Sequence, residues 1–280
     1  MTPDQQSLLE ALKTALDADG RILSAWLTGS LGAGRGDPWS DIDIALVVAA
    51  DDMPGLLADL MAPDGPLPAT ALRLSQFGRL VNGTTPKLQR FDLLLSTPEE
   101  FARQKAADVK LLFGDSSQGP TERPRPAPDP AAVARRVEGL VTEFLRVLSL
   151  APVPVGRREW VVMQDGVGHL RRLLIELMLE ENGVGPAERG GAKKLYPFLT
   201  PEQIAELEAL VPPRAVEADL LAANRDLRDL FLPRARRVAQ ATGAVWPADW
   251  EAAVMSGLAR DLPALGWAGL GWADATSGFP

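Results

Sequence analysis

The chain has 280 residues, of which 46% are hydrophobic and 24% are charged, a balance typical of a globular protein with one or two domains. It contains no cysteine and one histidine, which excludes disulfides, thiol catalysis, and metal sites built from thiolates or several histidines. The net charge of −8 argues against a nucleic-acid-binding protein, because such proteins carry a basic surface.

Helical and extended patterns alternate along the first part of the chain. Residues 4–18 have the apolar spacing of an amphipathic helix and do not resemble a signal peptide. Short apolar strands are expected at 21–28 and 41–49, with a helix over 52–61. No apolar run approaches the roughly 18–20 residues that cross a bilayer, so we expect a cytoplasmic protein without a membrane partner.

Two further strands, 71–80 and 87–95, are predicted to form a hairpin, because the turn-like sequence NGTTP of residues 82–86 separates them. The second strand carries Asp92 within an apolar run. A carboxylate in an apolar strand is costly unless it is paired or binds a metal. Asp92 is therefore a candidate metal ligand, and the alternative is an aspartate at a strand end that faces water.

The second part of the chain has almost only helical periodicity. A segment rich in proline and polar residues, 116–130, is expected to be a semi-rigid linker. It separates a first domain over 1–120 from a second, all-helical domain over 131–280. Helices are expected at 131–149, 157–182, 201–211, 214–241 and 247–261. The predicted fold class is α+β followed by a helical bundle.

The most informative segment runs from Gly29 to Ile44 (GSLGAGRGDPWSDIDI). Asp41 and Asp43 open an apolar strand, and the alternation of side chains along a strand places both carboxylates on one face, roughly 6–7 Å apart. Neighbouring carboxylates repel each other unless a cation neutralises them. Mg²⁺ binds carboxylates and keeps positions for water and phosphates. The glycine-rich turn upstream offers N–H groups to those phosphates.

Gly29-Ser30, a variable loop and then Ser40-Asp41-x-Asp43 resemble the signature of the nucleotidyltransferase superfamily that includes DNA polymerase beta. The layout of such a domain before a helical domain is similar to that of two-domain aminoglycoside and lincosamide nucleotidyltransferases. The resemblance implies a polymerase-beta-like catalytic domain with a mixed sheet. It also implies two Mg²⁺ ions as cofactors and an NTP, expected to be ATP, as co-substrate.

The resemblance implies a role for each matching residue. Asp41 and Asp43 would be shared ligands of the metal ions. Asp92 matches the third carboxylate on a neighbouring strand, which would act as a metal ligand or as the general base. Three residues would hold the triphosphate: Gly29, Ser30 and Ser40. For Ser40, a cap at the start of the strand is the alternative.

The helical domain offers further candidates. Lys193 could reach a triphosphate oxygen, as a lysine of the helical domain does in resembling enzymes, or could belong to an exposed basic pair in a loop. Asp165 and Glu176 lie on the helix expected over 157–182, and either could be the general base in place of Asp92. The alternative is that they are solvated charges paired with nearby arginines. His169 is expected to pack within or cap that helix.

Together these features predict transfer of an NMP, expected to be AMP, from an NTP to a hydroxyl of a small molecule. An acidic protein suits a cationic acceptor, so an aminoglycoside is expected, with antibiotic resistance as the implied role. A lincosamide acceptor and a homodimer stay open. Nucleotidyl transfer to a protein or tRNA also stays open, as does a non-catalytic nucleotide-binding module, although all three carboxylates are present.

Overall fold

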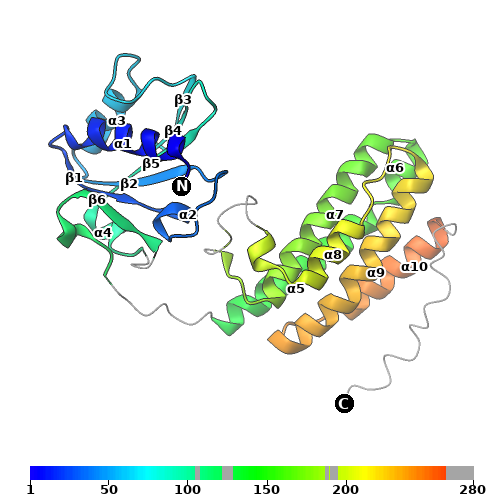
Figure 1. Ribbon diagram of the computed structural model, residues 1–280. Helices are drawn as coiled ribbons and strands as arrows, with labels where there is room; N and C mark the ends of the chain where they lie inside the picture. Colours follow the sequence, from blue (N-terminus) through cyan, green and yellow to red (C-terminus); the bar gives the residue numbers. More distant parts are fainter. Residues whose placement is uncertain (105–107, 122–128, 187–188, 190–194, 263–280) are drawn as a thin grey trace. The chain divides into compact units, whose positions relative to one another are not determined.

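The computed structural model divides into two compact units, residues 1–125 and residues 126–280 (Figure 1). The structure describes residues 1–104, 108–121, 129–186, 189 and 195–262. Within those residues, the first unit combines a mixed sheet with helices and the second unit is helical, which confirms the predicted fold class. Part of the predicted linker, 122–128, lies outside the described residues, and so does Lys193.

The first unit is built on a six-stranded sheet with the strand order β3-β4-β5-β2-β1-β6. The strands are β1 (Ile22–Leu27), β2 (Ile42–Val48), β3 (Leu72–Gln76), β4 (Leu80–Thr84), β5 (Arg90–Ser96) and β6 (Lys110–Gly114). Strands β2 and β5 run parallel, and the other neighbouring pairs run antiparallel. Strand β6, which the sequence pattern did not predict, pairs with β1 at the sheet edge.

Helices cover both faces of this sheet. They are α1 (Pro3–Asp17), α2 (Gly29–Gly32), α3 (Met53–Met61) and α4 (Pro98–Phe101). Helix α1 begins at a capping box formed by Thr2 and Gln5 and buries its leucine stripe in the main core, which α3 also joins. Phe101 of α4 packs with Trp26 and Val47 on the other face of the sheet. The unit therefore has a large core on one face and a small one on the other.

The predicted hairpin turn at residues 82–86 is wrong. Asn82 and Gly83 lie within β4, and the chain turns earlier, where Phe77 and Gly78 have positive φ angles of 53° and 66°. Gly83 is needed for close packing, because a Cβ at this position would clash with the ring of Phe91 on β5. The correct register places Asn82 directly opposite Asp92.

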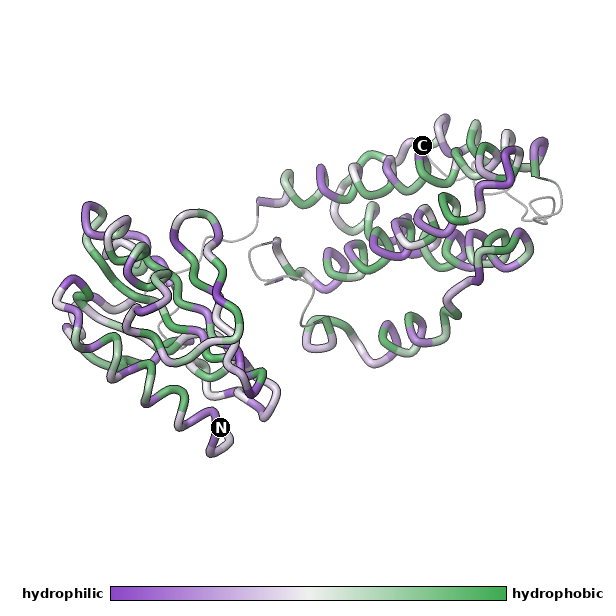
Figure 2. Tube along the Cα trace, turned by 90° about the horizontal axis from the view of Figure 1, so that it is seen from above, coloured by the Kyte–Doolittle hydropathy of each residue, from purple (hydrophilic) through white to green (hydrophobic). Residues whose placement is uncertain are grey.

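The helical unit confirms the five predicted helices and adds a short one. Its helices are α5 (Pro130–Ser149), α6 (Pro152–Arg157), α7 (Trp160–Glu181), α8 (Pro201–Ala209), α9 (Glu217–Thr242) and α10 (Ala248–Asp261). Hydrophobic and hydrophilic residues alternate along the long helices (Figure 2). At the centre, the rings of Phe144 on α5 and Phe231 on α9 stack with their centroids 3.7 Å apart.

One segment in the described part of the chain, residues 130–157, is long and apolar enough to cross a membrane by length and composition alone. It consists of α5 and α6. Five residues of α5 are buried in the core of the helical unit: Val137, Val141, Phe144, Leu145 and Leu148. One face of α5 therefore lies in that core, and 33% of the apolar window is buried.

A buried ion cluster lies within the helical unit, centred on Glu180 of α7. Only 3% of the Glu180 side chain is exposed. Arg136 donates hydrogen bonds to its two carboxylate oxygens at 2.8 and 3.0 Å, and Arg189 forms a second ion pair with it. The hydrogen bonds to Glu180 raise the pKa of the Arg136 guanidinium. The cluster therefore compensates a carboxylate that would otherwise be costly to bury.

We expect Glu180→Gln to lower the free energy of unfolding by about 3 kcal/mol, because Arg136 loses its buried carboxylate partner and Arg189 keeps only Glu176 among the described carboxylates. Urea denaturation followed by circular dichroism measures the change. Asp261→Asn is the control, because Asp261 pairs with Arg260 at an exposed site and should contribute far less to stability. Equal destabilisation by the two substitutions would contradict this interpretation.

Candidate active site

Three carboxylates meet on neighbouring strands of the first unit. Asp43 on β2 lies directly opposite Asp92 on the parallel strand β5, and Asp41 immediately precedes β2. One carboxylate oxygen of each residue lies within 4.8 Å of the other two, and all three residues are half-buried. The structure thus brings together the three predicted metal ligands. Carboxylates this close repel one another, and a divalent cation among them would relieve the repulsion.

The alternation of side chains along the strands explains why the carboxylates of Asp43 and Asp92 lie close together. Ile42 and Ile44 are buried in the main core, so Asp43 between them faces the opposite side of the sheet. Asp92 lies in the same way between two core residues of β5. Parallel pairing in register then places the two carboxylates side by side on the less covered face.

Gly29 brings the backbone against the Asp43 carboxylate. It has a φ of 60°, in the left-handed region that favours glycine. A Cβ at this position would clash with Asp43 Oδ2. The preceding residue, Thr28, donates its backbone N–H to the carbonyl of Asp43 at 2.8 Å, which fixes the turn to β2. The glycine of the motif is therefore required by both its conformation and its closeness to the carboxylate.

Ser30 and Ser40, the two predicted phosphate-binding hydroxyls, lie next to each other. The Ser30 hydroxyl donates to Ser40 Oγ at 2.9 Å, and the Ser40 hydroxyl donates to Asp37 Oδ1 at 2.9 Å. The backbone N–H of Asp37 also donates to Ser40 Oγ at 3.0 Å. Ser40 thus ties Ser30 to Asp37 in the loop before β2, and its role in phosphate binding stays a prediction.

Helix α1 and strand β5 hold this loop from either side. The buried Gln5 side chain of α1 donates to the backbone carbonyls of Asp37 and Ser40 at 3.0 and 2.9 Å. Arg90 of β5 donates to the carbonyl of Trp39 at 3.3 Å, and its guanidinium lies 4.0 Å from Asp41 Oδ2. Sequence reasoning missed both residues, because their role depends on contacts between distant segments.

Asn82 is the third residue that sequence reasoning missed. Its amide nitrogen donates to Asp92 Oδ1 at 2.7 Å from the neighbouring strand β4. Its own Oδ1 is buried without a hydrogen-bond partner in the described structure. A donor to one carboxylate oxygen fixes the orientation of the Asp92 side chain, as the outer hydrogen-bond partners of metal ligands do. The role was missed because Asn-Gly is typical of a turn, and a turn was predicted at this position.

We expect Asn82→Ala to raise the Mg²⁺ concentration needed for half-maximal activity about 10- to 100-fold, because the variant loses the group that orients Asp92. Activity measured against Mg²⁺ concentration shows the shift, and a merely structural role would lower activity at every concentration. Thr84→Val is the control, because Thr84 shares the strand face of Asn82. An unchanged Mg²⁺ dependence in Asn82→Ala would contradict the role.

The remaining candidates lie in the helical unit. Glu176 forms an ion pair with Arg189, and Asp165 is exposed on α7, so their roles as general base stay predictions. His169, expected to pack within or cap this helix, lies in the middle of α7. Its ring is partly exposed, and its Nε2 lies 3.1 Å from Glu143 Oε1. Hydrogen bonds from Arg146, and to a lesser extent from His169, lower the pKa of Glu143 to about 2.

No protein-family model matches this chain. A search of curated proteins likewise finds no match. Among solved structures, the chain is similar to the crystal structure of an aminoglycoside 6-adenyltransferase from Bacillus subtilis. The two share 15% sequence identity over 92% of this chain and 98% of that chain, with a TM-score of 0.44.

Proposed function

We propose that this protein transfers an NMP group from an NTP to a hydroxyl of a small molecule. The observation that carries the proposal is the cluster of Asp41, Asp43 and Asp92 beside the left-handed Gly29 turn. Three carboxylates form the oxygen donor set that Mg²⁺ prefers, and the unpartnered Asn82 Oδ1 marks a further polar atom at the same site. When bound, such ions neutralise charge on the phosphates and on the attacking oxygen.

The chain's own residues would divide the remaining work. Backbone N–H groups of the turn at Gly29 and Ser30 would hold the triphosphate, with the Ser40 hydroxyl beside them. The Arg90 guanidinium lies close enough to Asp41 to offer a cation to the same phosphates. These contacts would fix the α-phosphate in line with the acceptor hydroxyl, and such positioning is the main contribution of a protein to phosphoryl transfer.

The proton of the acceptor hydroxyl needs a separate base. Asn82 donates to Asp92 Oδ1 and holds this carboxylate beside Asp43, where it can share a metal ion with Asp41 and Asp43. We therefore assign Asp92 to metal binding. Asp165 and Glu176 of the helical unit stay as candidates for the general base.

The acceptor is proposed to be an aminoglycoside and the donor ATP. The net charge of −8 favours a cationic acceptor and disfavours nucleic acid. Modification of such a compound in the cytoplasm would confer antibiotic resistance.

Pyrophosphate release tests the proposal. The full chain is incubated with Mg²⁺, each of the four NTPs, and a panel of aminoglycosides and lincosamides. We expect release that requires one class of acceptor and stops when EDTA removes the metal. Absence of release for every combination, from a chain that binds Mg²⁺ and NTP, would exclude both acceptor classes.

A further inference from the structure

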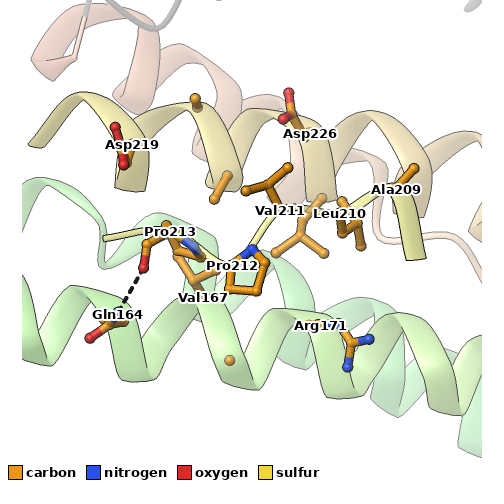
Figure 3. Close-up of a pocket in the computed structure, with 14 residues that line it drawn as sticks. Gln164, Val167, Arg171, Ala209, Leu210, Val211, Pro212, Pro213, Asp219 and Asp226 are labelled. Carbon is orange, nitrogen blue, oxygen red and sulfur yellow. Dashed lines mark hydrogen bonds between the residues drawn. The ribbon is translucent and has the colours of Figure 1, made fainter. Parts of the chain in front are cut away.

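The helical unit contains a cavity of about 610 Å³ between α7, α9 and the loop that follows α8 (Figure 3). Residues at helical spacing line it from both helices, as Figure 3 shows for Gln164, Val167 and Arg171 on α7. The middle of each stripe carries small residues, Gly168 on α7 and the pair Ala222 and Ala223 on α9. Such small side chains leave space between the two helices.

The two ends of the cavity differ in chemistry. At one end, the Gln164 side chain donates to the carbonyl of Pro213 at 2.7 Å and ties the loop to α7 (Figure 3). At the other end of the α7 stripe, Arg171 is exposed and has no hydrogen-bond or ion-pair partner among the residues that the structure describes. Two carboxylates also line the cavity: Asp219 forms an ion pair with Arg214 at 2.7 Å, and Asp226 lies 3.5 Å from its neighbour Arg225. The cavity therefore has the Arg171 guanidinium at one end, where it can pair with an anionic ligand.

We propose that this cavity binds an amphipathic organic anion. The apolar ring or chain would lie beside Gly168 and Ala222, and a carboxylate or sulfonate would pair with Arg171. The volume lies within the range of about 300–1,000 Å³ typical of small-molecule sites. The carboxylate of Asp226 disfavours ligands with several negative charges. This site belongs wholly to the helical unit, and its existence does not depend on nucleotidyl transfer.

Gly168 offers a way to close the cavity without disturbing the fold. A Cβ at Gly168 would meet no atom within 4 Å, so a leucine there extends into open space. Gly166 is the matched control, because it lies on the same helix, is equally free of neighbours and does not line the cavity. Both replacements remove a glycine from a helix interior, and each should therefore be stabilising or neutral.

The experiment is a fluorescence titration of the full chain with 8-anilinonaphthalene-1-sulfonate, which combines an apolar aromatic body with one sulfonate. We expect saturable binding that Gly168→Leu weakens at least about tenfold by occupying the cavity, and that Gly166→Leu leaves within about twofold. Arg171→Gln is expected to weaken binding about tenfold through loss of a charge-assisted contact. Circular dichroism and thermal unfolding confirm that each variant is folded.

Binding by Gly168→Leu that equals that of the wild type would overturn the proposal, and so would equal losses in the two glycine variants. A second arm, which alone rests on the proposed function, measures pyrophosphate release in the presence of 8-anilinonaphthalene-1-sulfonate. The proposed acceptor is cationic and the ligand of this cavity is anionic, so we expect binding that leaves the KM of the acceptor unchanged. Inhibition that is competitive with the acceptor would place the acceptor in this cavity and overturn its assignment to an anionic ligand.

Discussion

Asp43→Asn is expected to reduce the proposed nucleotidyl transfer at least about 1,000-fold, because the amide cannot replace an anionic ligand at the centre of the proposed metal site. Asp43 lies between Asp92 on the neighbouring strand and the backbone of Gly29, so it is at the centre of the cluster. The substitution keeps the size of the side chain, and steady-state turnover at saturating Mg²⁺ and NTP measures its effect.

The same variant should be folded and slightly more stable than the wild type. Removing one of three clustered negative charges relieves repulsion of about 0.5–1 kcal/mol, which urea denaturation detects. Asp51→Asn is the control, because Asp51 is an exposed carboxylate beyond the opposite end of β2, and it should change neither activity nor stability. Wild-type turnover by Asp43→Asn would show that the cluster does not bind the catalytic metal.

Gly29→Ala is expected to lose activity at least about 100-fold and to lower the free energy of unfolding by more than 2 kcal/mol. Two costs combine at this position. The left-handed backbone penalises any side chain, and the added Cβ would clash with the Asp43 carboxylate and displace it. Turnover and urea denaturation of the same preparation measure the two effects.

Gly34→Ala separates these two costs. Gly34 has a φ of 72°, yet a Cβ at this position would meet no atom within 4 Å. The control should therefore show the backbone penalty alone, about 1–2 kcal/mol, and keep most of its activity. If the two variants lost activity equally, the approach of Gly29 to Asp43 would not be what the site requires.

The centre of the candidate site could be predicted because its information is local. Asp41 and Asp43 follow a Gly-Ser turn at the start of a strand, and the period of two along that strand fixes which side they face. Asp92 could be predicted because a carboxylate in an apolar strand calls for a partner. Parallel pairing of β2 with β5 then brings the three together.

The supporting residues could not be predicted, because each acts across a long sequence separation. Gln5 reaches a loop more than thirty residues away, as its bond to the carbonyl of Ser40 shows. Asn82 was concealed by a local signal, since Asn-Gly is typical of a hairpin turn and here lies inside β4. The packing of Gly83 against Phe91 outweighs that local preference, and only the tertiary structure reveals it.

In the helical unit, periodicity predicted the helices well and the polar contacts poorly. The apolar stripes of α5, α7 and α9 specify their buried faces. Glu180, however, is buried because Arg136 and Arg189 come from other parts of the chain to pair with it. From the sequence alone, a charged residue within a helix is predicted to be solvent-exposed, because its partners are not known.

Mass spectrometry of the acceptor tests the central claim most directly. The full chain is incubated with Mg²⁺, NTP and the acceptor that stimulates pyrophosphate release, in parallel with Asp43→Asn. We predict that the acceptor gains the mass of one NMP with the wild type and remains unmodified with the variant. An unmodified acceptor in both reactions, or equal modification in both, would contradict nucleotidyl transfer at the cluster of Asp41, Asp43 and Asp92.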